Sequence, residues 1–253
     1  MNSKFLSKKI ISFTILLTVL TLILYSCTPV TETEKKEVPK EKREIEPPKK
    51  IIKNLDEIER NYIKSSNIKM MDKISFDYNK KGKLTNREKL STVVYDKDGL
   101  TNETIIYNKN EVQSKFNYKY NKKGQRIETI RYNPNGDAEK KYTYEYNEYG
   151  NKTKSIRYDL NDKIEKYYEY EYDDEGNLID EVWYDADGST EYEIKYEYNS
   201  DGKKKFAMTY NSNKNLIYKY EFRYDGKGNV VEETKYDADD EKVGIVQYVY
   251  KYF

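Results

Sequence analysis

The sequence repeats itself every 26 residues, and this period constrains the fold more than any other feature. The repeated motif is an aromatic residue, any residue, a tyrosine, an Asn or Asp, two further residues and usually a glycine. Its tyrosines are Tyr120, Tyr146, Tyr172, Tyr198, Tyr224 and Tyr250. A second tyrosine follows each of the first five after 12 residues. A fixed period of this length indicates a repeat architecture, whose units bury their apolar faces against their neighbours.

Each repeat contains two stretches in which apolar and polar residues alternate. The stretch before the turn is the stronger one, as in "YEYEY" at 168–172, where aromatic residues hold the even positions and glutamates the odd ones. The stretch after the glycine is weaker, as with Ile156 and Tyr158. A period of two predicts β-strands with one apolar face.

Short polar segments between these stretches predict tight turns. The clearest is "NPNG" at 133–136, where Pro134 has the φ angle that the second position of a type I turn needs. Asn133 can accept hydrogen bonds from the backbone ahead, and Gly136 can close the turn with a positive φ. Turns this short join antiparallel neighbours.

These signals predict an all-β fold, in which tandem 26-residue β-hairpin repeats form a continuous antiparallel meander of about 14 strands. Laid flat, such a sheet would expose a face of tyrosines far larger than soluble monomers leave open. It must therefore twist or curl on itself, or pair with a second copy. Because twist is intrinsic to sheets, we expect a curled sheet in a monomer.

Two acidic segments, "DADG" at 185–188 and "DKDG" at 96–99, raise the alternative of calcium binding. Acids two residues apart before a glycine are how many calcium loops begin. The equivalent turns carry Asn as readily as Asp in the first place, and Lys123 or Asn135 in the third. A turn explains every repeat, whereas calcium would explain few. We therefore expect no metal and no cofactor, with calcium as the alternative.

The N-terminus has the order of a secretory signal. Lysines in the first nine residues precede an uncharged, mostly apolar run over 10–25, and "LYSC" at 24–27 completes that run. This order indicates export rather than a membrane-spanning helix. Cys27 is the only cysteine of the chain. A plain signal peptide or an anchor helix is the alternative.

The segment resembles a bacterial lipoprotein signal with its lipobox, in which Leu24, Ser26 and Cys27 match. The resemblance implies removal of residues 1–26 as a signal peptide and lipidation of Cys27, palmitate included. The acyl chains would then hold the exported protein at a membrane. In a Gram-negative cell, Thr28 after the cysteine implies the outer membrane or the cell surface.

Three further segments follow the signal. Residues 27–50 are rich in Lys, Glu and Pro, cannot bury a core, and are expected to form a disordered tether. Residues 51–72 are transitional. Within them "NLDE" at 54–57 has an Asn followed three residues later by a Glu, which predicts a helix N-terminus and a short helix over about 55–63. The β-repeat domain is expected over 73–253.

The tandem Tyr-[Asp/Asn]-x-x-Gly units, with aromatic residues ahead of the tyrosine, resemble the YD or RHS-type repeats of bacterial surface and secreted proteins. The resemblance covers about residues 74–253 and implies a β-strand repeat scaffold. Three turns lack the glycine and carry Asp162, Lys214 and Asp240 in its place. Because the chain ends inside its last repeat, we expect no toxin cargo of the kind that family often carries.

Composition narrows the classes of function. Lys and Arg number 46 against 45 for Asp and Glu, so the chain shows no nucleic-acid signal. It has no histidine, which excludes Ser-His-Asp and Cys-His catalysis and a His-ligated zinc. We expect a binding or structural scaffold, not a catalyst, with a protein or glycan ligand.

Tyr167 and Trp183 are the candidate exposed contact residues. Both hold odd positions, which the alternation assigns to the polar face, whereas the even-numbered aromatic residues are expected to fill the core. Two alternatives stay open. A carboxylate-based glycan hydrolase would need two acids across a sugar. An outer-membrane-associated β-barrel is suggested by the alternation and the terminal Phe253.

Overall fold

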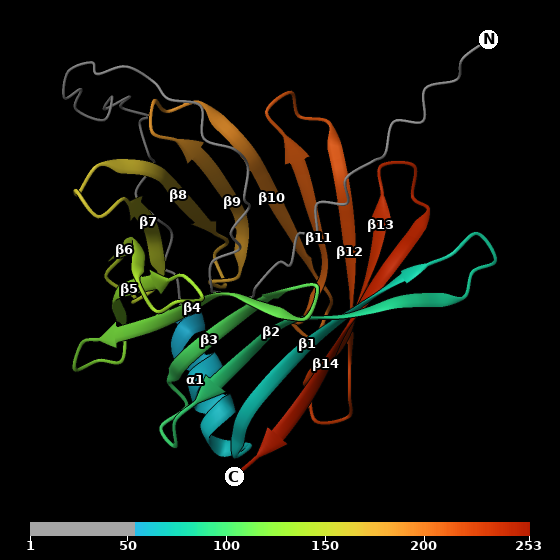
Figure 1. The fold of residues 1–253 in the computed structure, drawn as a ribbon, viewed down its shortest axis with the longest axis horizontal. Helices are drawn as coiled ribbons and strands as arrows, with labels where there is room; N and C mark the ends of the chain where they lie inside the picture. Colours follow the sequence, from blue (N-terminus) through green and yellow to red (C-terminus); the bar gives the residue numbers. More distant parts are fainter. Residues whose placement is uncertain (1–53) are drawn as a thin grey trace. The chain divides into compact units, whose positions relative to one another are not determined.

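The computed structural model describes residues 54–253, which form one helix and fourteen strands (Figure 1). The helix α1 covers Leu55–Ser65. The strands are β1 (Ile68–Tyr78), β2 (Leu84–Tyr95), β3 (Thr101–Asn108), β4 (Glu111–Tyr120), β5 (Arg126–Tyr132), β6 (Ala138–Tyr146), β7 (Lys152–Tyr158), β8 (Ile164–Tyr172), β9 (Leu178–Asp185), β10 (Thr190–Tyr198), β11 (Lys204–Asn211), β12 (Leu216–Tyr224), β13 (Val230–Asp237) and β14 (Lys242–Tyr252). The predicted signal peptide and tether lie outside the described residues.

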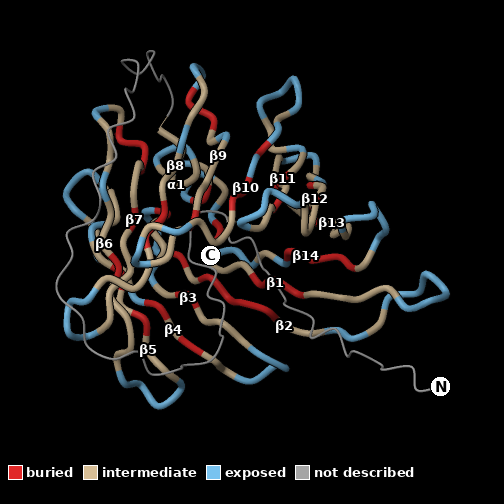
Figure 2. Tube along the Cα trace, turned by 90° about the horizontal axis from the view of Figure 1, so that it is seen from above, coloured by how far each residue is buried: buried red, intermediate tan, exposed pale blue. Residues whose placement is uncertain are grey.

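Each strand pairs antiparallel with the next one in the sequence, and β1 also pairs with β14, which closes a 14-stranded barrel (Figures 1 and 2). The seam between β1 and β14 is a regular ladder that includes Met71 opposite Tyr250 and Ser75 opposite Val246. The all-β class and the continuous meander that the sequence predicts are therefore present. The sheet curls until its two edges meet, so none of the fourteen described strands is left with an open edge.

The tight turns have the geometry that their residues predict. In the β4–β5 turn, the N–H of Gly124 donates to the carbonyl of Asn121 at 2.9 Å, and Gly124 has a φ of 79°. The Asn121 side chain accepts from the N–H groups of Lys123 and Gln125. The positions without glycine keep the same backbone, since the φ angles of Asp162, Lys214 and Asp240 lie between 61° and 63°.

"DADG" and "DKDG" are turns of this kind. The N–H of Gly188 donates to the carbonyl of Asp185 at 3.0 Å. In the other segment, the Asp96 carboxylate accepts from the N–H groups of Asp98 and Leu100 at 2.8 and 3.0 Å. Within residues 54–253, no group of three or more acidic, His or Cys side chains is placed to hold a metal ion.

The wall of the barrel has a buried belt at mid-height. On the even-numbered strands from β4 to β14, the inward-facing residue at this height is buried in every strand. These residues are Phe116, Tyr142, Tyr168, Ile194, Tyr220 and Val246. Figure 2 shows buried positions along the strands and exposed positions at the turns. The even-numbered positions of these strands thus supply the core, as the alternation predicts.

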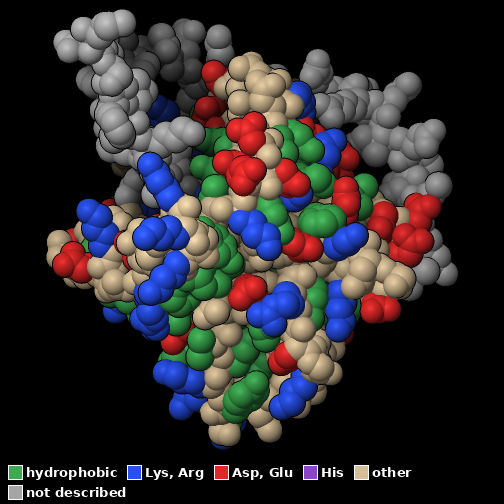
Figure 3. Space-filling view, turned by 90° about the vertical axis from the view of Figure 1, so that its right-hand side faces the viewer, with side chains coloured by type: hydrophobic (Ala, Val, Ile, Leu, Met, Phe, Trp, Pro, Cys, Tyr) green, Lys and Arg blue, Asp and Glu red, His purple; other side chains and the backbone are tan. Residues whose placement is uncertain are grey.

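The outer face mixes charge with apolar side chains. On the even-numbered strands, outward positions hold exposed charged residues, among them Lys119, Glu145 and Glu171. On the odd-numbered strands, outward positions include Ile130 and Val182, which are half-buried beside them. In Figure 3, charged and hydrophobic side chains accordingly alternate over the visible face without a continuous apolar band.

Helix α1 begins at its expected N-cap, where the Asn54 side chain accepts from the N–H of Glu57, and it ends at Ser65, two residues beyond the predicted end. The strand region starts earlier than expected, because β1 begins at Ile68 and not at residue 73. The reason is that Ile68, fully buried, packs with Ile63 of the helix in one small cluster. The predicted boundary at residue 73 is therefore wrong by five residues.

Candidate functional site

Helix α1 lies against the turns at one end of the barrel, which we call the helix end. The N–H of Leu55 donates to the Asn151 side chain after β6, and the Tyr62 hydroxyl donates to the Asn229 side chain after β12. In the β2–β3 turn, a side chain at Gly99 would place its Cβ 2.2 Å from the Arg60 carbonyl oxygen. The helix is thus fitted closely to several turns far apart in the sequence.

Further contacts tie α1 to the turns after β2 and β4. The Arg60 guanidinium donates to the Lys123 carbonyl at 3.0 Å, and the Lys64 ammonium pairs with Asp98 at 2.8 Å. Phe253, at the end of the chain, donates its N–H to the Asn67 carbonyl at 2.9 Å. The C-terminus therefore lies at the helix end, as Figure 1 shows.

Just inside the helix end, cations alternate with aromatic rings around the wall. From β5 to β13, the first residue of each odd-numbered strand projects between the aromatic residues of the two flanking strands, and Lys73 in the middle of β1 lies at the same level beside Tyr248. We call these residues the cation–aromatic layer: Tyr118, Arg126, Tyr144, Lys152, Tyr170, Leu178, Tyr196, Lys204, Phe222, Val230, Tyr248 and Lys73. The 26-residue period produces the layer, since each repeat contributes one ring and one strand-starting residue.

The cations of the layer lie over the ring faces. The Arg126 guanidinium is 4.2 Å from the centre of the Tyr118 ring. The Lys152 ammonium is 4.3 Å from the Tyr170 ring, and the Lys204 ammonium is 3.9 Å from the Tyr196 ring. Each cation also has a second ring of the layer within 6 Å. These distances are those of cation–π attraction.

The rings of the layer are held by hydroxyl partners fifteen residues earlier in the sequence. The Tyr144 hydroxyl bonds Thr129 at 2.7 Å, and the Tyr170 hydroxyl bonds Ser155 at 2.9 Å. In the repeat where this partner position is an apolar Ala207, the ring is a phenylalanine, Phe222. In these three repeats ring and partner match in polarity, as expected where an unpaired buried hydroxyl would be costly, whereas the Tyr118 hydroxyl of the same layer has no hydrogen-bond partner among residues 54–253.

A second set of hydroxyl bonds explains why the motif specifies tyrosine rather than phenylalanine. Each motif tyrosine donates to a backbone carbonyl at the start of the preceding strand. Tyr146 donates to Arg126, Tyr172 to Lys152 and Tyr224 to Lys204, each at 2.8 Å. These bonds fix the carbonyls of the very residues whose side chains supply the cations of the layer.

Burial at this level is uneven. Tyr118, Tyr144, Tyr170 and Lys204 face inward and are half-buried, whereas other residues of the layer are buried, namely Lys73, Lys152, Tyr196, Phe222 and Tyr248. An inward-facing side chain keeps accessible surface only where space adjoins it. Eight strands already enclose an interior that side chains can just fill, and 14 strands enclose a wider one. The described strands therefore surround a space lined by rings, hydroxyl groups and cations.

Two cations of the layer have no counter-ion. Among residues 54–253, neither the Lys152 nor the Lys204 ammonium makes a hydrogen bond or an ion pair, and their close contacts are with rings. Burial lowers the pKa of Lys152 below its ordinary value, although the charges of Asp56 and Glu181 oppose the change. Enclosure by the wall lowers the pKa of Lys204 to about 8, again against nearby carboxylates.

Lys73, the remaining lysine of the layer, is different because it has a carboxylate partner. Its ammonium lies 3.9 Å from the Glu233 carboxylate, and both side chains are buried. Glu233 also accepts a hydrogen bond from the Tyr248 hydroxyl. Burial raises the pKa of Glu233 and lowers that of Lys73, since it disfavours both charged forms.

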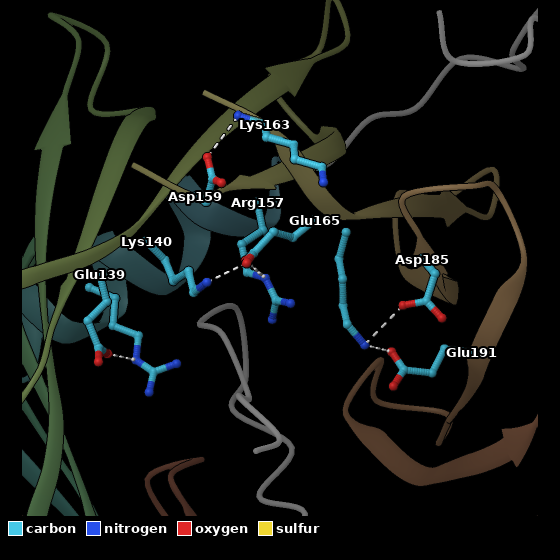
Figure 4. Close-up of polar contacts among 10 residues, drawn as sticks. Glu139, Lys140, Arg157, Asp159, Lys163, Glu165, Asp185 and Glu191 are labelled. Atoms are coloured by element: carbon cyan, nitrogen blue, oxygen red, sulfur yellow. Dashed lines mark hydrogen bonds and ion pairs between the residues drawn. The ribbon is translucent and has the colours of Figure 1, made fainter. Parts of the chain in front are cut away.

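At the opposite end of the barrel, Lys140 and Arg157 are paired with carboxylates (Figure 4). Arg157 lies 3.1 Å from the Glu165 carboxylate, which also receives Lys140. Lys166 contacts Glu191 and, at 3.4 Å, Asp185. The arginine contact is an ion pair without hydrogen-bond alignment. This network recurs with the repeat and balances its own charge, so the unpaired lysines at the helix end stand apart from it.

Helix α1 brings acidic side chains to the helix end. Asp56 and Glu59 lie on the side of the helix that includes the buried Ile63, and both are half-buried. Their charges act on the layer: Asp56 favours the protonated form of Lys152, and Glu59 does so for Lys152 and Lys204. Glu57, on the same helix, is exposed.

The prediction that Tyr167 and Trp183 are exposed is wrong. Trp183 is 4% exposed and faces inward, with its ring edge-to-face against Tyr168 at 5.3 Å. Tyr167 is 9% exposed; it faces outward but stacks on Tyr184 at 4.7 Å beneath the Lys154 ammonium. The error for Trp183 has a simple cause: even positions of β8 pair with odd positions of β9, so the parity of inward residues changes between strands.

Cys27, the predicted lipidation site, lies outside the described residues. The lysines of the cation–aromatic layer were not singled out from the sequence, although a signal for them exists. Arg126, Lys152 and Lys204 all stand two residues after a turn glycine, in phase with the period. In a surface turn such a cation would be unremarkable, and only closure of the sheet places it inside.

One pair of acids bears on the hydrolase alternative. Burial, together with the charge of Glu193, raises the pKa of Asp180 to about 6. Glu193 in turn pairs with Lys195 at 3.3 Å and with Lys214 at 2.5 Å. A carboxyl group of raised pKa is a candidate acid. Asp180 stands opposite Lys195 on the outer wall, where burial and the like charge of Glu193 account for the raised pKa without a catalytic role.

No protein-family model matches the chain, and no curated protein is similar to it in sequence. Among solved structures, a porin-like protein from Bacteroides uniformis shares 10% identity at a TM-score of 0.41, over 73% of this chain and 98% of that one. A porin-like protein from Bacteroides vulgatus shares 12% at a TM-score of 0.33, over 73% and 98%. The Tc holotoxin pore of Photorhabdus luminescens shares 17% at a TM-score of 0.32, over 68% of this chain and 10% of that one. At these values the likenesses say nothing about function.

Over residues 54–253, no helix is both long and apolar enough to span a membrane.

Proposed function

We propose that this protein is an exported binding protein, anchored to a membrane through lipid on Cys27, which holds a ligand inside its barrel and is not a catalyst. The observation that supports binding is the pair of lysines, Lys152 and Lys204, which have no ion pair among residues 54–253 and lie beside half-buried, inward-facing rings. A purely structural scaffold gains nothing from such groups, because an unpaired charge removed from water destabilises the fold. Perturbed groups of this kind gather at functional sites.

The anchoring part of the proposal rests on the lipobox-like segment that ends at Cys27. An outer-membrane location follows only in a Gram-negative cell. The barrel topology also suits the alternative of a barrel embedded in that membrane. Against it stand outward charges near mid-strand, such as Glu169, Lys195 and Glu221, because membrane barrels carry an apolar outer band and a Lys or Arg at its centre costs about 2–4 kcal/mol.

Anchoring and embedding are separated by one variant. In cells, Cys27→Ala should lose labelling by a fatty-acid probe and should release a folded, soluble protein. Continued labelling would contradict lipidation at Cys27. A variant that stays in the membrane and resists carbonate extraction would favour the embedded barrel.

Binding is tested on the protein as it comes from its own cells. Gentle detergent extraction followed by native mass spectrometry should show the full chain with a bound small molecule. Denaturation should release that molecule, and a Tyr144→Trp variant, which enlarges a residue lining the interior, should carry less of it. A chain that consistently carries nothing, and that binds no small-molecule probe, would reject the binding function.

A further inference from the structure

Two lysines in the cation–aromatic layer have a chemistry that specifies the ligand. Lys152 and Lys204 enter the barrel from β7 and β11, and each ammonium lies over a tyrosine ring without an ion pair among residues 54–253. Their neighbours on the outer wall, such as Lys205, are exposed instead. At the opposite end, Lys140 (Figure 4) and Lys166 are both paired with carboxylates.

An enclosed ammonium that lacks a counter-ion weakens the fold, and a cation–π contact offsets only part of that loss. A bound anion would supply the missing partner, and hydrogen bonds to charged groups are among the stronger ones in proteins. The half-buried rings of Tyr144 and Tyr170 border the same space and offer apolar surface to the rest of a ligand.

We propose that the barrel binds a small organic anion at the helix end, with its charged group between Lys152 and Lys204 and its apolar body against the tyrosine rings. This inference rests on the proposed binding function and adds the chemical class of the ligand. The charge of Glu181 acts on both lysines, which places them in one electrostatic neighbourhood, and an anion bound there must outcompete this carboxylate.

Helix α1 has a part in the same site. Glu59 faces the helix end, and its charge acts on Lys73, Lys152 and Lys204. A carboxylate in this position supplies part of the counter-charge when no ligand is bound, and it repels an incoming anion. The helix therefore competes with the ligand for the cations. The contacts between the helix and the turns determine how easily the ligand displaces Glu59 from them.

The test uses two dyes with the same aromatic frame. Anilinonaphthalene sulfonate is an anion, and phenylnaphthylamine lacks the sulfonate and is neutral. On the full chain, we expect the anionic dye to bind more tightly than the neutral one by about tenfold or more. Lys152→Gln and Lys204→Gln should each weaken the anionic dye by about tenfold and leave the neutral dye unchanged.

The controls are matched to these variants. Lys205→Gln removes the same charge one residue away on the outer wall and should change neither affinity. Because Lys152→Gln and Lys204→Gln remove unpaired charges, their melting temperatures should equal or exceed that of the wild type, which shows that lost binding is not lost folding. Glu59→Gln should tighten the anionic dye severalfold, whereas Glu57→Gln, on the exposed side of the same helix, should not.

Three results would overturn parts of the proposal. If both dyes bind equally and the lysine variants change neither affinity, the barrel binds ligands but the anion site is wrong. If neither dye binds, the anion site and the binding function both fail. If Glu59→Gln behaves as Glu57→Gln does, the helix does not compete with the ligand.

Discussion

The tyrosine hydroxyl groups of this barrel have different hydrogen-bond partners at different heights along the wall. The motif tyrosines donate to backbone carbonyls, and in the cation–aromatic layer the hydroxyl groups of Tyr144, Tyr170 and Tyr196 bond Thr, Ser or Glu side chains. In the buried belt, by contrast, the Tyr142 hydroxyl has no hydrogen-bond partner among residues 54–253. A substitution that removes only the oxygen therefore has a different effect at each height.

We expect Tyr144→Phe to lower the free energy of unfolding by about 1–2 kcal/mol, since it leaves the buried Thr129 hydroxyl without its partner. Tyr142→Phe removes no hydrogen bond, so it should lower the free energy of unfolding by no more than about 0.5 kcal/mol or should raise it. Urea melts of both variants measure the difference. Equal losses would contradict this assignment of the hydroxyl groups.

The turn glycines allow backbone strain to be measured apart from packing. Gly136 has a φ of 92°, and a Cβ added there would meet nothing within 4 Å. Gly136→Ala should therefore destabilise by about 1–2 kcal/mol through the left-handed conformation alone. Gly226 has the same open space without a positive φ, so Gly226→Ala is the control and should change stability by under about 0.5 kcal/mol. Similar denaturant midpoints for the two variants would argue against strain.

At the scale of the strand, residues with even and odd numbers face opposite sides of the wall. Which of the two sets faces inward differs from one strand to the next. Tyr168 and Trp183 face the same way, although one number is even and the other odd. In an antiparallel pair, the numbers of partner residues have a constant sum, here an odd one. The length of the turn therefore decides which residues of the next strand face inward.

Strand β8 tests this division. Tyr168→Ala empties a buried position against Trp183 and should destabilise by about 3 kcal/mol. Glu171→Ala, an exposed outward position three residues on, should change stability by no more than about 0.5 kcal/mol. Thermal or denaturant melts give both values. A loss of similar size in Glu171→Ala would mean that the outward row carries a structural role.

Much of the strand architecture could be predicted, because its signals are local. The alternation in "YEYEY" and the Asn-to-Gly spacing of the turns depend on neighbours in the sequence. The candidate site could not be predicted, because it depends on closure. Lys152 and Lys204 come from strands four apart, and Glu59 reaches them only because α1 lies across the helix end. No local pattern distinguishes a curled sheet from a closed one.

At the scale of the whole molecule, the number of enclosed tyrosines controls the response to alkali. Burial raises the pKa of Tyr142, Tyr170 and Tyr248 well above its ordinary value, and it raises the pKa of Tyr224 to about 12. An unfolded tyrosine loses its proton near pH 10. Above that pH the unfolded chain binds fewer protons than the folded one, so stability falls as pH rises.

We therefore expect full tyrosine-linked stability below about pH 10 and a cooperative loss of structure above it. Tyrosinate absorbance should rise in two phases, first for the exposed phenols and then steeply for the enclosed ones, together with loss of the β-sheet circular dichroism signal. Lys204, with its pKa lowered to about 8, acts in the other direction and stabilises as pH rises above that value. A single smooth absorbance rise without unfolding would show that the phenols are not enclosed.

The seam between β1 and β14 has a consequence for how such a chain can evolve. An open solenoid can gain or lose one unit by recombination and simply become longer or shorter. Here the two edge strands must meet. Loss of one 26-residue unit would remove two strands and, at about 4.8 Å per strand, shorten the circumference by roughly 10 Å. The number of repeats is thus fixed by the geometry of the closed barrel. Selection that maintains the width of the barrel therefore acts against gain or loss of repeat units in the gene.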